Sequence, residues 1–219
     1  MKLSRRLALT DEDVAGRNLF RHWAGDAGCA LRLDTMGNLF ARREGKHPNA
    51  APVLSGSHLD TQPLGGKFDG AYGVLAGLEV MRVLADAEYV TRHPIEVAAW
   101  TNEEGCRFSP AMAGSGVFAG THSETKLAET VDRDGLSFAD ELARIGYAGS
   151  EPVGGRDIAA FFEVHIEQGP ILEAKETKRL TTHKITFFCC LSHFYHSCLH
   201  VIIQTCTCRY PRQGSNLPR

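Results

Sequence analysis

Residues 52–85 read PVLSGSHLDTQPLGGKFDGAYGVLAGLEVMRVLA, and this stretch indicates the fold. Its first part, residues 52–57, is a short apolar run that predicts a buried strand ending at His58. A glycine-rich loop follows as far as Gly70, and from there to Ala85 apolar side chains recur at helical spacing. The side chains expected on the packed side of this helix are Val74, Leu75, Leu78, Val80, Met81 and Leu84. A strand, a loop and a helix in this order are the unit from which α/β sheets are built.

Further elements are predicted on both sides of this unit. A helix is expected from Asp11 to about Ala27, because Thr10 is a good N-cap, acidic residues fill the first turn, and Gly28 is suited to end it. The other predicted elements are two short strands joined as a hairpin (30–34 and 38–42), a buried strand (95–100), a surface helix (137–145) and a third buried strand (160–164). Strands that alternate with helices predict an α/β sheet.

Residues that bind metals or transfer protons stand where three predicted strands end. His58 follows the first buried strand, Glu103 and Glu104 follow the second, and His165 follows the third. In open α/β sheets, ligands bind where strands end and loops begin. The sequence therefore predicts that a functional site lies at this edge of the sheet.

The composition is that of an ordinary globular protein. Of 219 residues, 43% are hydrophobic and 23% are charged. The formal net charge of −2 gives no electrostatic attraction to nucleic acid or to an anionic membrane. The N-terminal stretch lacks the apolar segment of a secretory signal, and Cys29 and Cys106 stand singly, without the pattern of a disulfide framework. We therefore expect a cytoplasmic protein that has no nucleic-acid or membrane partner.

Residues 177–219 differ in composition from the rest of the chain. They hold five of the seven cysteines and four of the ten histidines. A zinc site is one interpretation, but these cysteines lack a pair of ligand motifs with two-residue spacing. A membrane helix over residues 185–203 is another, but histidines interrupt the apolar run. We favour a Cys/His-rich tail unrelated to the fold, either disordered or the product of a gene-model error such as translated intron sequence.

Two aspartates follow the first buried strand. Asp60 lies two residues after His58, where its carboxylate can accept the second ring N–H of a metal-binding histidine, although such pairs also occur by chance. Asp69 lies between Gly66 and Gly70, just before the predicted helix. It is either the N-cap of that helix or a carboxylate whose two oxygens bridge two cations.

The residues at the other two strand ends add ligands of the same kinds. Neighbouring side chains at a strand end point in different directions, so one of Glu103 and Glu104 can bind a metal while the other faces substrate and transfers a proton. A solvated acidic turn is the alternative for this pair, and a structural role is the alternative for His165. Together, the four segments supply nitrogen and carboxylate ligands suited to zinc or another divalent transition metal.

Three blocks of the sequence carry a family resemblance. They are GSHLDTQPLGGKFDGAYGVLAGLEV (56–80), WTNEEGCRFSPAMAGSGVFAG (100–120) and FFEVHIEQGPILEA (161–174). In order and spacing they resemble the signature blocks of the M20 metallopeptidase-like family, in its amidase/hydantoinase/carbamoylase branch. This branch includes N-carbamoyl-L-amino acid hydrolases, allantoate amidohydrolases and β-ureidopropionases. The resemblance runs from about Arg6 to Lys175.

The resemblance implies a site for two divalent metal ions, zinc or manganese. His58 and His165 would bind one metal, Glu104 would bind the other, and Asp69 would bridge both. Glutamate, aspartate and histidine ligands accept zinc and manganese alike, so the sequence does not select between them.

The resemblance also implies a reaction, the hydrolysis of a linear amide or ureido C–N bond in a small-molecule substrate. Glu103 would be the general base and acid, Asp60 would support His58, and Gln168 would contact the ureido or amide group. An M20 aminoacylase or dipeptidase is the alternative enzyme, and Gln168 after His165 favours the first. A non-catalytic, truncated fragment is the alternative outside enzymes.

The sequence departs from the family after its third block. The family inserts a smaller lid domain, which mediates dimerisation, and then resumes the catalytic domain with a last metal-binding histidine. Neither has a counterpart here, so we expect residues 1–176 to be the N-terminal part of the catalytic domain, truncated before the lid, and residues 177–219 to be the unrelated tail. Impaired activity is expected, and the homodimer of the full-length family is not expected for this chain.

Overall fold

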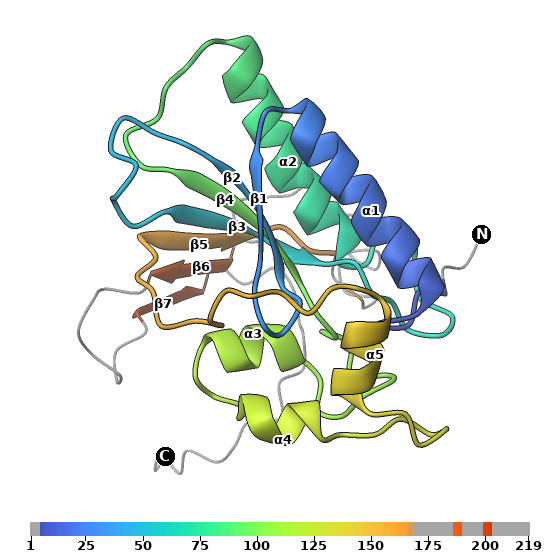
Figure 1. Cartoon of the computed structure of the whole chain (residues 1–219). Helices are drawn as coiled ribbons and strands as arrows, with labels where there is room; N and C mark the ends of the chain where they lie inside the picture. The colour runs from blue at the N-terminus through green and yellow to red at the C-terminus, as the bar shows by residue number, and fades with distance from the viewer. Residues whose placement is uncertain (1–4, 167, 169–185, 190–198, 203–219) are drawn as a thin grey trace, which may run out of the picture.

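The computed structural model describes residues 5–166, 168, 186–189 and 199–202 (Figure 1). The chain has the predicted α/β architecture, a mixed sheet flanked by helices. The helices are α1 (Asp11–Asp26), α2 (Ala71–Asp86), α3 (Ala113–Phe118), α4 (Glu124–Ala128) and α5 (Phe138–Arg144). The strands are β1 (Ala30–Leu33), β2 (Leu39–Arg43), β3 (Val53–His58), β4 (Ile95–Trp100), β5 (Ala160–Glu163), β6 (Thr186–Cys189) and β7 (Leu199–Ile202). Sequence periodicity does not predict α3 and α4, because helices of six and five residues are too short to show it.

The strands form one sheet in the order β1-β2-β4-β3-β5-β6-β7. β3 lies between β4 and β5 and runs parallel to both, whereas the remaining strand pairs are antiparallel. Because β3, β4 and β5 point in the same direction, their carboxyl ends meet at one edge of the sheet. The three strand ends that carry predicted site residues are therefore neighbours in space.

Alternation along the strands divides the core between the two faces of the sheet. Figure 1 shows α1 and α2 lying over one face, and their apolar side chains share one core cluster with β2 and β4. Members from these elements include Phe20, Ala24, Leu39, Ala41, Val74, Leu78, Met81, Val97 and Ala99. The other face carries a smaller, aromatic cluster made of Phe40, Leu54, Ala98, Trp100 and Phe161, against which Phe118 and Ile158 pack.

Two glycines of α2 face the sheet and set the orientation of that helix. A Cβ atom at Gly77 would lie 2.8 Å from Cγ2 of Val97, and a Cβ atom at Gly73 would lie within 3 Å of Ser57 in β3 and of Val164 after β5. This close approach turns Leu75 and Val80 outward, where they are 39% and 53% exposed. The prediction that these two side chains pack is therefore wrong, since an apolar stripe does not reveal that glycines face the sheet. Three other side chains predicted to pack, Val74, Leu78 and Met81, are buried.

A buried carboxylate lies on the aromatic face of the sheet. Glu96 of β4 is fully buried, and it accepts hydrogen bonds from Arg42 at 2.9 Å and from Arg156 at 2.6 Å. A third guanidinium, that of Arg32, lies 3.6 Å from the same carboxylate. A buried charge is tolerated only when it is paired, so this cluster ties β1, β2 and β4 to the segment that leads into β5.

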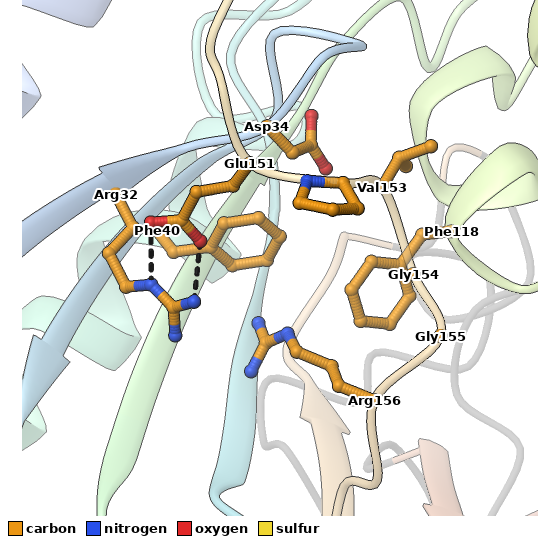
Figure 2. A pocket seen from close by; sticks show the side chains of 10 residues that line it. Arg32, Asp34, Phe40, Phe118, Glu151, Val153, Gly154, Gly155 and Arg156 are labelled. Carbon is orange, nitrogen blue, oxygen red and sulfur yellow. Dashed lines mark hydrogen bonds and ion pairs between the residues drawn. The ribbon is translucent and has the colours of Figure 1, made fainter.

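A pocket of about 320 Å³ opens beside this cluster (Figure 2). Phe40 and Phe118 form its apolar wall, and Arg156 lies 4.9 Å from the centre of the Phe40 ring. The guanidinium of Arg32 is paired with Glu151 at 2.5 Å. The seven residues predicted to form the functional site do not line this pocket.

The predicted tail, residues 177–219, lies mostly outside the described residues. β6 and β7 fall within it, and their backbones extend the sheet beyond β5. The possible zinc ligands Cys190, Cys198, Cys206 and Cys208 are outside the described residues, so the nature of the tail stays a prediction. In the part of the chain that the structure describes, no helix has the length and apolar character needed to cross a membrane. Cys29 and Cys106 are free thiols.

Replacing Glu96 by alanine is expected to destabilise the fold by about 3–5 kcal/mol, because it leaves three partly buried arginines without their shared carboxylate. Glu44→Ala is the matched control. Its carboxylate also binds Arg42 but is 56% exposed, so a loss below about 1 kcal/mol is expected. Urea unfolding of the two variants and the parent chain gives the comparison, and equal losses would contradict it.

Candidate metal centre

The parallel register of β3 and β5 brings the two predicted histidine ligands together. Ser55 of β3 faces Phe162 of β5. The same pairing, continued three residues beyond Ser55 and Phe162, sets His58 opposite His165. Their Nε2 atoms are 3.4 Å apart and their ring centres are 5.6 Å apart. Two imidazoles more than a hundred residues apart in sequence thus face the same point.

Backbone carbonyl groups orient both imidazole rings. Nδ1 of His58 donates to the carbonyl oxygen of Asp60, and Nδ1 of His165 donates to that of Ile166, each at 2.9 Å. Because a carbonyl only accepts, each Nδ1 carries the proton. The neutral form of each ring therefore presents the lone pair of Nε2 to the site, which is the arrangement that metal-binding histidines require.

Asp69 is directed at the two histidines and does not cap α2. The N-cap of α2 is Gly70, without a side-chain cap, so the interpretation of Asp69 as the cap is wrong. Its Oδ1 lies 3.2 Å from Nε2 of His165 and 3.9 Å from Nε2 of His58. Its Oδ2 accepts a hydrogen bond from Nε2 of Gln168, which brings a fourth predicted site residue into contact.

Asp60 supports the site in a different way from the predicted one. Its carboxylate lies 3.8 Å from Nδ1 of His58, and the ring N–H is bound instead by the backbone carbonyl of Asp60. The two carboxylate oxygens accept the backbone N–H groups of Glu103 and Glu104, both at 3.2 Å. The buried side chain of Asp60 therefore joins the end of β3 to the end of β4.

The glutamate pair after β4 meets the same cluster. Asn102 has a φ of 52°, and the two glutamates follow this left-handed residue. Oε2 of Glu103 lies 3.3 Å from Nε2 of His58, and its side chain is 24% exposed. Oε2 of Glu104 accepts a hydrogen bond from Nε2 of Gln62 at 3.0 Å. A solvated acidic turn does not describe this pair, because both side chains are turned toward the histidines.

Two groups of side chains in the described residues have the geometry to hold a metal ion. They are His58, Asp69 and His165, and His58, Glu103 and Glu104, with ligand atoms within 4.8 Å of one another in each group. Oε1 of Glu104 is buried and has no hydrogen-bond partner within the described part of the chain, and Oδ1 of Asp69 is buried beside the Nε2 atoms of the two histidines. Buried carboxylate oxygens beside imidazole nitrogens fit a divalent transition metal.

The His165–Asp69 contact shifts the protonation of both groups. Burial opposes the charged imidazolium, but Asp69 and the neighbouring groups outweigh it and raise the pKa of His165 to about 9. Burial also acts to raise the pKa of Asp69, yet His165, Gln168 and His58 outweigh it and hold that pKa below its ordinary value. Without a metal, a proton on His165 therefore neutralises Asp69.

Glu103 and Glu104 are shifted toward their neutral forms, whereas the contact between His165 and Asp69 favours the charged form of each. Burial raises the pKa of Glu104 to about 7, against the hydrogen bond from Gln62, and the charge of Asp69 adds to the increase. Burial also raises the pKa of Glu103, against the attraction of His58. Several carboxylates in one half-buried cluster cannot all be charged at low cost, so the cluster favours either protons or a cation.

Two contacts of the site involve three residues that sequence reasoning did not single out. Gln62 holds Glu104, and Ser57 donates a hydrogen bond to Glu163 at 2.6 Å beside the two histidines. Ser57 and Glu163 lie one and two residues before the two predicted histidine ligands, which is a weak sequence signal. Gln62 lies in the loop after Asp60, where the sequence contains no signal of its role.

Comparisons with known proteins find one family model and several similar proteins. Residues 54–210 match the model of peptidase family M20/M25/M40. The chain is similar to the N-carbamoyl-L-amino-acid amidohydrolase of Rhizobium meliloti, with 55% identity over 172 residues that cover 78% of this chain and 41% of the relative. It is also similar to the ureidoglycolate hydrolase of Arabidopsis thaliana, with 35% identity over 177 residues that cover 77% of this chain and 37% of that protein.

Solved structures give the same relationship. An amidase of the hydantoinase/carbamoylase family from Burkholderia multivorans matches with a TM-score of 0.77 and 59% identity, covering 78% of this chain and 42% of that one. A related structure from Burkholderia ambifaria matches with a TM-score of 0.76 and 55% identity, covering 79% of this chain and 42% of that one. The chain therefore spans about two fifths of the length of the relatives it matches.

The Gly70→Ala substitution is expected to disrupt the centre. Gly70 has a φ of 65°, and a Cβ atom there would lie 2.4 Å from the His58 ring. We expect a loss of about 1–3 kcal/mol in stability together with loss of metal uptake. Gly66→Ala in the same loop is the control, because its Cβ would meet nothing within 4 Å. Thermal unfolding and elemental analysis of the two variants test this, and equal metal content would contradict it.

Metal affinity is expected to increase with pH. In the metal-free chain the pKa of Glu104 is about 7 and that of His165 is about 9, whereas ligands must be deprotonated to bind. Below pH 7 a cation competes with both protons, and between pH 7 and 9 it still competes with the proton on His165. Calorimetric Zn²⁺ titrations in buffers of different ionisation enthalpy should show affinity rising, and proton release falling, from pH 6 to 8. A constant affinity over that range would contradict this assignment of protons.

Proposed function

The chain belongs to peptidase family M20/M25/M40, and from this premise we propose that it is the metal-binding part of a hydrolase of linear amide or ureido C–N bonds. The substrates proposed are N-carbamoyl-L-amino acids, allantoate or similar ureido compounds. One observation carries the proposal, the convergence of His58, His165 and Asp69 with a glutamate pair at one edge of the sheet. The names of the relatives, an N-carbamoyl-L-amino-acid amidohydrolase and a ureidoglycolate hydrolase, support the choice of bond.

We propose two divalent metal ions, zinc or manganese, at this centre. His58 and His165 would hold one ion, Glu104 would hold the other, and Asp69 would contribute an oxygen to each. The donor chemistry and the buried carboxylate oxygens beside the two histidines support this assignment. When bound, the metals supply a Lewis acid for the substrate carbonyl and a source of nucleophile at neutral pH.

Glu103 is the proposed general base and acid. It is partly exposed, at 24%, so it can reach a substrate, and it lies 3.3 Å from Nε2 of His58. Burial raises its pKa toward the working range of a group that first accepts and then donates a proton. In this role Glu103 takes a proton from the attacking water and returns it to the leaving nitrogen, while Asp60 fixes the backbone that carries it.

Gln168 is the proposed contact to the substrate. Its side chain is exposed, and its amide already reaches Asp69. An amide both donates and accepts hydrogen bonds, as the ureido group of the proposed substrates does. An aminoacylase or dipeptidase substrate lacks the second nitrogen of the ureido group, so Gln168 favours the ureido class.

The activity of this chain in isolation is a separate part of the proposal. The chain spans 41% of the length of the Rhizobium relative, so a non-catalytic, metal-binding role is the second candidate. Metal content together with turnover of N-carbamoyl-L-amino acids, allantoate, N-acetyl amino acids and dipeptides separates these functions. Turnover of the ureido compounds supports the proposal, turnover of the last two classes favours the aminoacylase or dipeptidase alternative, and bound metal without turnover favours the non-catalytic role. A small-molecule substrate, a cytoplasmic location and the absence of a homodimer stay predictions from the sequence.

Glu103→Gln is expected to lower kcat by about 10²- to 10⁴-fold, because the amide cannot transfer the proton. Metal content should be unchanged, since Glu103 is not a proposed ligand. Glu129→Gln on the exposed end of α4 is the control and should leave both quantities unchanged. Steady-state kinetics and elemental analysis of the purified variants test the role. Loss of metal in Glu103→Gln, or an unchanged kcat, would count against it.

A further inference from the structure

A side-chain hydrogen bond joins β3 and β5 just before the two histidines in the chain. The hydroxyl of Ser57 donates to Oε1 of Glu163 at 2.6 Å. Ser57 is fully buried and directly precedes His58, and Glu163 lies two residues before His165. A contact this short is typical of a hydroxyl donating to a charged carboxylate, which is among the stronger hydrogen bonds in proteins.

The hydrogen bond lies where the strand pairing approaches its end. The register of β3 with β5 runs from Val53 opposite Ala160 to Ser55 opposite Phe162. The histidine rings project beyond these pairs, with their Nε2 atoms 3.4 Å apart. A backbone ladder holds strands at their common spacing, but it does not fix side chains three residues beyond its last pair. The Ser57–Glu163 contact supplies a link in that interval.

The first turn of α2 packs against the same link. A Cβ atom at Gly73 would lie 2.8 Å from Cβ of Ser57 and 2.5 Å from the carbonyl oxygen of Val164. α2 begins two residues after Asp69, so this packing also sets the position of Asp69 relative to the histidines. Three proposed ligands therefore come from three segments that meet at Ser57 and Val164, next to Glu163.

We propose that Ser57 and Glu163 form a positioning pair that sets the spacing of His58 and His165 and thereby determines metal affinity. The inference rests on the metal centre of the proposed function. Neither residue belongs to the two groups of side chains whose atoms converge on a metal position, so the pair acts through the histidines. Residues that orient metal ligands typically change metal affinity by about 10- to 100-fold when removed.

Titration of the full chain with Co²⁺, followed by visible absorption, tests the pair, because the absorption reports both affinity and ligand geometry. The variants are Glu163→Ala, Ser57→Ala, the double variant and Glu163→Gln. Glu163→Gln keeps an oxygen that accepts from Ser57 and removes the charge. The control is Glu151→Ala, which removes a carboxylate bound to Arg32 beside the pocket on the aromatic face.

We expect Glu163→Ala and Ser57→Ala each to weaken Co²⁺ binding by about 10- to 100-fold and to change the absorption bands. The double variant should bind Co²⁺ no more weakly than the weaker-binding single variant, because the two substitutions remove the same hydrogen bond. Glu163→Gln should restore most of the affinity, and Glu151→Ala should match the parent chain. Thermal unfolding of each metal-free variant separates this effect from a loss of folding.

Three outcomes would overturn the inference. Unchanged affinity and absorption in Glu163→Ala would remove the positioning role and leave the metal centre intact. Equal losses in Glu163→Gln and Glu163→Ala would assign the effect to charge rather than to the hydrogen bond. A parent chain that binds no Co²⁺ would overturn the proposed function, and the positioning pair with it.

Discussion

The structure depends on the parallel pairing of β3 with both β4 and β5. Parallel strands bring their carboxyl ends to the same edge, so the residues after each strand meet although they are far apart in the chain. His58, the glutamate pair and His165 occupy these three positions. Asp69 reaches the same point because the loop from β3 returns to start α2 on the adjacent face of the sheet. A shift of one residue in either parallel register would turn a ligand to the other face.

At this edge of the sheet, burial disfavours charged side chains, whereas contacts between opposite charges favour them. Asp60, Glu103 and Glu104 are carboxylates whose pKa burial raises, and the imidazole of His165 holds its proton to about pH 9 beside Asp69. A metal-free cluster of this kind binds protons in place of cations. Hydrogen bonds from the surrounding residues reduce the free-energy cost of burying the charged carboxylates. Asp60 accepts two backbone N–H groups, and Gln62 and Gln168 donate to the outer oxygens of the carboxylates. In the proposed function, divalent cations would replace these protons.

The two faces of the sheet are stabilised by different interactions. The face under α1 and α2 is apolar and closely packed, with Gly73 and Gly77 allowing the helix to approach the strands. The aromatic face carries Glu96 and its arginines, an ionic cluster that links strands which are not neighbours in sequence. The seven predicted site residues lie apart from the pocket on this second face. The candidate metal centre and the ionic cluster therefore occupy separate places in the fold.

The sequence by itself determined the fold class, the order of the main elements and the kinds of residue at each strand end, because apolar periodicity and capping residues act over short distances. The family blocks around His58, Glu103 and His165 also indicated the chemistry. Only the tertiary structure decided that the carboxylate of Asp60 binds the backbone of the glutamates, that Leu75 and Val80 of α2 point outward, and that Ser57 meets Glu163. Such contacts join residues distant in sequence, and their geometry follows from strand order, register and helix rotation, which local patterns do not encode.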